Sequence, residues 1–143
     1  MPAGTIPYSA FPSPIPAGLF EAVETALSAA GFVPRCDRAP DGLHVSDMGT
    51  ATTALSNYAG SAAQLAFVKT QKQTALDAVF DANFDLSKFI RGGASTNITA
   101  ANVGTFLATI TNNYRSLRAS ISGAANVSAV NAININSGWP ANP

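Results

Sequence analysis

The strongest hydrophobic pattern in the chain lies between residues 100 and 122. Apolar side chains recur there at intervals of four, three, four, three and four residues: Val103, Leu107, Ile110, Tyr114, Leu117 and Ile121. We call these six positions the seam. A 3.5-residue repeat predicts a helix that packs lengthwise against a second helix at a shallow angle. The second helix belongs either to another copy of the chain or to the same chain in an antiparallel hairpin, the commoner arrangement in short bundles.

The natural partner for such a hairpin is a long helix over residues 49–84. Its apolar positions form one broad stripe: Leu55, Tyr58, Ala62, Leu65, Leu76, Val79 and Phe80. Residues 69–74 are polar on all sides, so the helix is either exposed or briefly interrupted there. Gly49 and Gly60 weaken the helix by up to about 1 kcal/mol each.

Two shorter helices flank this pair. Residues 17–31 place apolar side chains at helical spacing, and Gly31 suits the residue that follows a helix end. The sequence predicts that this helix lies across the hairpin. A second short helix follows Asn126, which is a good N-terminal cap, and Asn97 or Thr99 is expected to cap the helix over 100–122.

Residues 32–48 are expected to form a loop, because prolines interrupt them and Pro40–Asp41–Gly42 is a turn signal. A short hairpin would pair Phe32–Val33 with Leu43–Val45. Ser46 or Asp47 is placed to cap the helix that follows.

Both ends of the chain are expected to be irregular. Residues 1–16 contain five prolines, which block a helix and remove hydrogen-bond donors. They predict an extended arm that exposes four apolar side chains: Ile6, Tyr8, Phe11 and Ile15. Residues 134–143 form an Asn-, Pro- and Gly-rich tail around Trp139. Either the two ends contact neighbouring subunits, or they fold back on their own helices.

The expected fold class is therefore mainly α: a helical hairpin or small helical bundle with an extended Pro-rich N-terminal arm and an irregular C-terminal tail. The arm spans residues 1–16, the helical domain 17–133 with the 32–48 loop inside it, and the tail 134–143. A chain of 143 residues is long enough to bury a core of its own.

Composition changes this picture in one respect, because only 11% of the residues are charged. Eight basic residues balance eight acidic ones, so no net charge draws the chain to nucleic acid or anionic lipid. Interface cores are depleted in charge, which favours a surface that meets protein. The alternative is a compositional bias towards Ala, Thr and Asn. We expect no signal peptide and no transmembrane segment.

Reactive side chains gather in one place, the 36–47 loop: Cys36, Asp37, Asp41, His44 and Asp47. A metal site or a thiol nucleophile with its base needs such groups, but the spacing matches no zinc pattern and the chain has no second cysteine. We therefore interpret the cluster as loop and capping residues, and expect no catalytic residue, cofactor or metal.

Two further groups of charged residues are interpreted as solvated helix faces. Asp77, Asp81 and Asp85 are four residues apart, a spacing that also suits a cation, but lysines lie nearby. Arg115 and Arg118 are too few for nucleic-acid binding in a neutral chain.

The Ala/Thr/Asn-rich helices and the Asn/Pro/Gly-rich tail resemble small virion proteins of tailed bacteriophages. The stretches that carry the resemblance are TFLATITNNYRSLRASI (105–121) and VNAININSGWP (130–140). The resemblance implies a self-associating capsid, neck or tail component without enzyme activity, made in the host cytoplasm and located in the virion. Its partners would be copies of itself and neighbouring structural proteins, not nucleic acid or membrane.

The expected function is a structural subunit, with assembly contacts at the seam, at Ile6, Tyr8, Phe11 and Ile15 of the arm, and at Trp139. Three alternatives stay open. They are a subunit of an extracellular protein filament, a monomeric helical adaptor, and a small metal- or thiol-dependent enzyme that uses the 36–47 loop.

Overall fold

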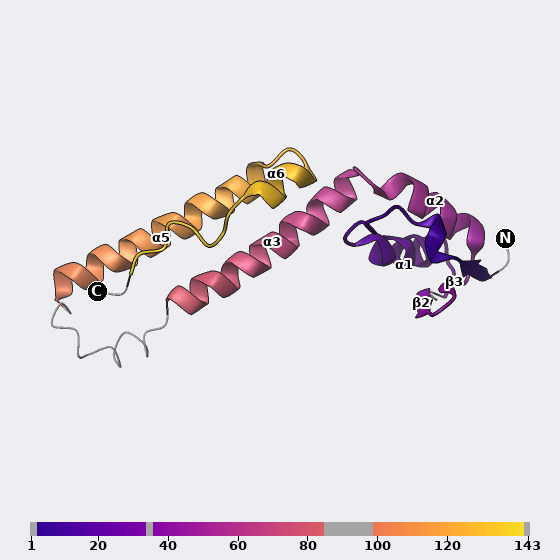
Figure 1. Cartoon of the computed structure of the whole chain (residues 1–143), viewed down its shortest axis with the longest axis horizontal. Coiled ribbons are helices and arrows are strands. Elements are labelled where there is room, and N and C mark those ends of the chain that lie inside the picture. Colours follow the sequence, from indigo (N-terminus) through magenta and orange to yellow (C-terminus); the bar gives the residue numbers. More distant parts are fainter. Residues whose placement is uncertain (1–2, 34–35, 85–98, 142–143) are drawn as a thin grey trace. The chain divides into compact units, whose positions relative to one another are not determined.

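The computed structural model describes residues 3–33, 36–84 and 99–141, and these are mostly helical. Figure 1 shows the elements along the chain. The chain divides into two compact units, unit 1 over Met1–Val68 and unit 2 over Lys69–Pro143. The division falls inside the segment 17–133 that the sequence analysis treats as one helical domain. Each unit is described by itself.

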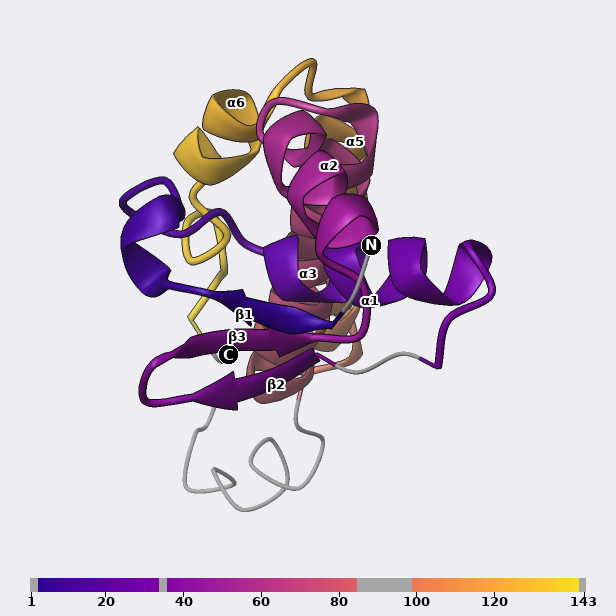
Figure 2. The ribbon, with the colours of Figure 1, turned by 90° about the vertical axis from the view of Figure 1, so that its right-hand side faces the viewer.

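Unit 1 contains a three-stranded antiparallel sheet, whereas the sequence predicts a loop over 32–48 with a short hairpin in it. The strands are β1 (Gly4–Ile6), β2 (Cys36–Ala39) and β3 (Gly42–Val45), in the spatial order β1-β3-β2. Figure 2 shows β3 between the other two strands. The predicted turn at Pro40–Asp41 joins β2 to β3, but the predicted strand Phe32–Val33 is wrong, since β2 is the partner of β3.

Two helices cover one face of this sheet (Figure 2). The first, α1 (Leu19–Ala29), contacts β2, and the second, α2 (Met48–Tyr58), contacts β1. The sequence predicts that α1 lies across the long helical hairpin, whereas its main packing partner within unit 1 is α2. The core of unit 1 is formed by buried apolar side chains: Ile6, Phe11, Leu19, Val23, Leu27, Leu43, Val45, Ala51 and Tyr58.

The signals at the ends of these helices are confirmed. Gly31 adopts a φ of 84°, and the Phe32 N–H donates to the Leu27 carbonyl at 3.0 Å, which closes α1 in a Schellman motif. Asp47 is the N-cap of α2, since its carboxylate accepts from the Thr50 N–H at 2.8 Å. Local hydrogen bonding thus fixes where both helices stop or start.

The prediction of one continuous helix over 49–84 is wrong, because the chain breaks between α2 and α3 (Ala62–Asn83). Gly60 has a φ of 76°, which ends the helical path. Ser61 then accepts a hydrogen bond from the Gln64 N–H, and the Gln64 side chain accepts one from the Gly60 N–H. This reciprocal capping starts α3 as a separate helix.

Unit 2 is built on the helical hairpin that the sequence predicts, in a shorter form. From Lys69 onward, α3 lies antiparallel to α5 (Ala100–Gly123), as Figure 1 shows. The Lys69 ammonium donates to the Ser122 carbonyl at 2.7 Å near one end, and the Tyr114 hydroxyl donates to Asp77 at 2.6 Å further along. Apolar side chains are buried in this unit: Leu76, Phe106, Ile110, Ile121 and Val130.

The remaining elements of unit 2 also follow local signals. Thr99 caps α5 by accepting from the Asn102 N–H, whereas the alternative cap Asn97 lies outside the described residues. Asn126 caps α6 (Val127–Ala132) by accepting from the Ala129 N–H at 2.8 Å. The chain then runs back along α5 (Figure 1), where the Asn113 amide donates to the Ser137 carbonyl at 3.0 Å.

Candidate functional site

The seam of α5 is largely occupied within unit 2. Ile110 and Ile121 are fully buried, and the other four seam residues are half-buried: Val103, Leu107, Tyr114 and Leu117. The Tyr114 ring lies 4.8 Å from the Phe80 ring of α3. This arrangement is the intrachain hairpin, so Ile110 and Ile121 have no exposed surface to offer a neighbouring copy. For the half-buried members, an assembly contact stays a prediction.

A polar network joins the two helices of unit 2. The Tyr114 hydroxyl donates to Asp77, and an Arg118 N–H donates to the Tyr114 oxygen at 3.1 Å. The hydrogen bond to Asp77 raises the pKa of Tyr114, because it favours the neutral phenol. Asp77 therefore joins α3 to α5 through Tyr114, and Arg118 contacts the same hydroxyl from within α5. The third member of the acidic series, Asp85, lies outside the described residues.

The opposite side of α5 is exposed and carries no charge at six positions: Ala101, Thr105, Ala108, Asn112, Ser116 and Ala119. We call these six residues the outer face of α5. Their spacing of four, three, four, four and three residues keeps them on one side of the helix. Arg115 lies beside this face and is exposed. The outer face is a surface of small side chains about five turns long.

The N-terminal segment is not a free arm in unit 1. Its residues 4–6 form the edge strand β1, and the short 3-10 helix η1 (Tyr8–Ala10) follows. Ile6 and Phe11 are only 2% and 7% exposed, because both enter the core of unit 1. Tyr8 and Ile15 remain 37% and 42% exposed. Only these two keep a surface that a neighbour can contact.

Trp139 packs within its own unit. Its indole N–H donates to the Ile135 carbonyl at 2.8 Å, and its ring meets the Phe80 ring edge-on with centroids 6.3 Å apart. The tail is therefore tied to α3, in keeping with the alternative that it folds back. The side chain stays half-buried, and a role for it in assembly stays a prediction.

The structure separates the two residues that the thiol-enzyme hypothesis needs. Cys36 pairs with Val45 across the sheet, and His44 pairs with Asp37. Neighbouring residues on a strand point to opposite faces, so Cys36 and His44 lie on opposite sides of the hairpin. The Cys36 thiol instead points to the Phe20 carbonyl at 3.7 Å, and burial raises its pKa, which disfavours the thiolate.

The remaining members of the loop cluster have local roles. His44 and Asp41 form a side-chain hydrogen bond of 2.9 Å, which lowers the pKa of Asp41. Asp47 caps α2 instead of joining them. Among the described residues, no group of three or more His, Cys, Asp or Glu side chains is placed to hold a metal ion. The cluster thus divides into a surface pair, a half-buried thiol and a helix cap.

The Asp47 cap predicts a pH dependence of stability. The hydrogen bond from the Thr50 N–H lowers the pKa of Asp47 to about 2, below the value of the unfolded chain. The carboxylate therefore stabilises the fold above about pH 4, and this contribution is lost as the pH falls towards about 2. Asp47→Asn should lower the melting temperature at neutral pH, with a difference from wild type that shrinks below about pH 4. Thermal unfolding at neutral pH and below about pH 4 measures this difference in melting temperature. Asp81→Asn controls for the loss of one charge. A difference that stays the same at both pH values would contradict the prediction.

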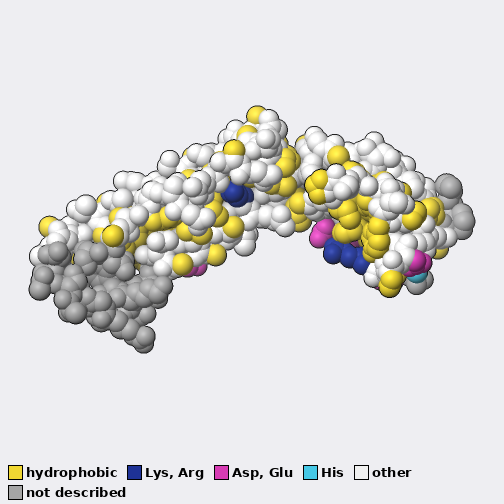
Figure 3. Space-filling view, in the orientation of Figure 1, with side chains coloured by type: hydrophobic (Ala, Val, Ile, Leu, Met, Phe, Trp, Pro, Cys, Tyr) yellow, Lys and Arg dark blue, Asp and Glu magenta, His cyan; other side chains and the backbone are white. Residues whose placement is uncertain are grey.

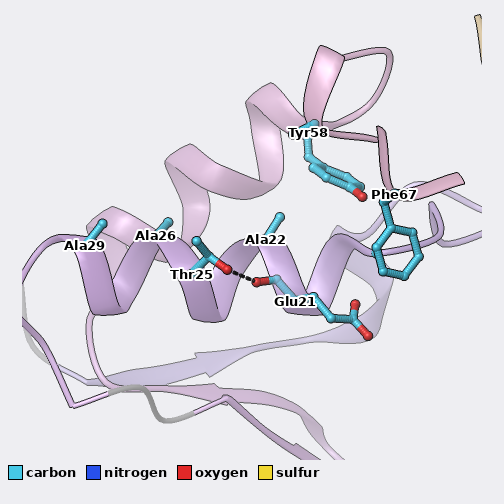
Figure 4. Close-up of a pocket in the computed structure, with 9 residues that line it drawn as sticks. Glu21, Ala22, Thr25, Ala26, Ala29, Tyr58 and Phe67 are labelled. Atoms are coloured by element: carbon cyan, nitrogen blue, oxygen red, sulfur yellow. Dashed lines mark hydrogen bonds between the residues drawn. The ribbon is translucent and has the colours of Figure 1, made fainter. Parts of the chain in front are cut away.

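Unit 1 also contains a groove that the sequence analysis missed. It has a volume of about 360 Å³ and lies between α1 and the start of α3, as Figure 4 shows. Its lining is mainly apolar: Gly18, Ala22, Ala26, Ala29, Tyr58 and Phe67. We call this the α1 groove. The signal in the sequence is the spacing of the three alanines, which forms a second apolar stripe beside the larger side chains of α1.

Comparisons with known protein families, curated proteins and solved structures gave no match to this chain. Among the described residues, no helix combines the length and apolar character that crossing a membrane requires.

Proposed function

We propose that this protein is a structural subunit that associates with copies of itself. The observation that carries the proposal is the outer face of α5, whose six residues are all exposed and uncharged. On a typical soluble helix, charged residues occupy the side opposite the core. The resemblance of the sequence to tailed-phage virion proteins supports a place in a capsid, neck or tail.

Desolvation explains why such a face favours protein contacts. Charged side chains resist removal from water, and interface cores are accordingly depleted in them. Small side chains also let a second helix approach closely, since interaxial distance depends on the residues at the contact. Figure 3 shows how sparse charged side chains are on one face of the molecule.

Association through helices is favoured over association through the sheet. Both edge strands are short, with three residues in β1 and four in β2. Pro7 follows β1, and Pro40 follows β2. Short strands that end in proline are poor templates for pairing with another chain, so the sheet edges are protected.

A substitution on the outer face of α5 tests the proposal. Ala108→Arg places a long charged side chain at its centre and should weaken association by about ten-fold or more, since about 1.4 kcal/mol corresponds to each factor of ten. The matched control is Asn57→Arg, which adds the same side chain at an exposed position near the end of α2. Sedimentation velocity of both variants measures the effect.

Two results would contradict the proposal. Equal association of Ala108→Arg and Asn57→Arg would exclude the outer face of α5 as a contact. A monomeric wild type at every concentration would favour the alternative of a helical adaptor that binds one different partner. For such an adaptor, the sedimentation coefficient would not change with protein concentration.

A further inference from the structure

We propose that the α1 groove of one copy receives the outer face of α5 from a second copy. This inference rests on the proposed function and names the surfaces that meet. It is drawn from three features: the shape of the groove, the size of the side chains on α5, and the charges beside both surfaces.

The groove is long enough for a helix. The hollow floored by Ala22, Ala26 and Ala29 continues into a second hollow of about 490 Å³ on the same side of α1. Glu21, Thr25 and Ala29 line both. The lining of the α1 groove runs from Gly18 to Ala29, which is about 16 Å along the helix, or three helical turns. A groove of this length, apolar along its alanine floor and polar along Glu21 and Thr25, suits a second helix more than a small ligand.

The floor of the groove selects for small side chains. Because alanine side chains are short, a second helix touches the floor only when its axis lies close to that of α1. The interaxial distance is then near the lower end of the usual range of about 8–10 Å. The outer face of α5 presents Ala108, Asn112 and Ser116 over two turns, and all three are exposed. A face with Leu or Phe at these positions would be held further away. The two surfaces are therefore matched in size.

Charge complementarity identifies the occupant as this protein. Glu21 and Glu24 are exposed at the groove, and neither forms an ion pair with a described residue. Arg115 is exposed beside the outer face of α5, likewise without an ion pair in the described part of the chain. The other lysines and arginines of the described residues are less suitable: Lys69 and Arg118 donate to partners in unit 2, Arg38 lies 4.1 Å over the Phe20 ring, and Lys72 is half-buried. Glutamates at the edge of the groove and an arginine beside the outer face of α5 complement each other between copies.

The contact joins two different surfaces, so two copies can exchange it reciprocally in a two-fold dimer, or each copy can pass it on to the next. Head-to-tail contacts of this kind produce rings when the rotation closes and filaments when it does not. Every copy presents one groove and one outer face. The arrangement therefore allows a closed dimer, a ring or a filament.

Charge reversal tests the inference on the full chain. Glu21→Arg and Arg115→Glu should each weaken association by about ten-fold or more, since each places like charges at the contact. The double variant, which carries both changes in one chain, should recover association. A mixture of the two single variants should also recover it, because each groove then meets an opposite charge on the other variant. Asp81→Arg serves as the control for charge reversal elsewhere, and circular dichroism checks that each variant is folded.

Each outcome has a distinct meaning. Recovery in the double variant and in the mixture supports the contact between copies, and it cannot arise from a misfolded single variant. Recovery in the double variant alone would place the contact within one chain and overturn the inference. Unchanged association of both single variants would also overturn it, while leaving the proposed function intact. A wild type that never associates would instead refute the proposed function itself.

Discussion

Replacing Phe11 by alanine should destabilise unit 1 by about 3–5 kcal/mol, the usual cost of removing a buried aromatic side chain. Phe11 is 7% exposed and lies 5.6 Å from the Phe20 ring of α1. Ile6→Ala should cost about 2–5 kcal/mol for the same reason, because Ile6 is 2% exposed and fixes β1 against the core. Chemical denaturation, with hydrogen exchange of the α1 amides to identify the unit, measures both effects.

The same segment supplies the matched controls. Tyr8 and Ile15 are 37% and 42% exposed, so Tyr8→Ala and Ile15→Ala should change stability by less than about 1 kcal/mol. Equal and large losses of stability in all four variants would mean that the whole segment packs against unit 1. Equal and small losses would mean that the segment is the free arm that the sequence pattern predicts.

The burial of Ile6 and Phe11 determines which variants can test an assembly role of residues 1–16. Deleting residues 1–16 removes β1 together with Ile6 and Phe11, so loss of assembly after the deletion would only report damage to unit 1. Substitution of Tyr8 and Ile15 keeps the fold and tests contact directly. Among the four apolar side chains predicted to form assembly contacts in this segment, only Tyr8 and Ile15 are exposed and can be tested in this way.

Gly18→Ala should destabilise unit 1 by roughly 2–5 kcal/mol. Gly18 has a φ of 78°, where a side chain costs about 1–2 kcal/mol. An added Cβ would also meet the Tyr58 hydroxyl and lie 2.7 Å from the Phe67 ring. Overpacking adds about 1–3 kcal/mol. The added Cβ would also displace the Tyr58 hydroxyl, which donates to the Ala17 carbonyl at 2.7 Å.

Gly31 at the other end of α1 is the control. Its φ of 84° imposes the same backbone strain, but an added Cβ has nothing within 4 Å. Gly31→Ala should therefore cost only the strain, about 1–2 kcal/mol. Denaturation curves of the two variants give the difference due to crowding at Tyr58 and Phe67. Equal losses would show that the walls of the α1 groove yield to a methyl group.

Local signals in the sequence predicted local structure well. Gly31, Asp47, Thr99 and Asn126 act within one turn of their own position, so composition and spacing suffice to place them. The seam likewise predicted the hairpin of unit 2, because a regular apolar repeat specifies a packed helix face whatever its partner.

Features that depend on distant contacts were not predictable in the same way. β1 is a strand only because β3 offers its hydrogen bonds nearly forty residues later, and five prolines obscured that signal. The break at Gly60 had a readable sign, since Ser61 and Gln64 have the spacing of a capping box, but the apolar stripe on both sides concealed it. The α1 groove needs three elements to meet, and its alanines count weakly in a hydrophobic pattern.

Sedimentation velocity of the unmodified chain tests the central claim of self-association most directly. Samples should cover concentrations from low micromolar to several hundred micromolar. The proposal predicts a weight-average sedimentation coefficient that rises with concentration above the value of a monomer, because association follows mass action. A single species with the mass of one 14.6 kDa chain at every concentration would contradict it.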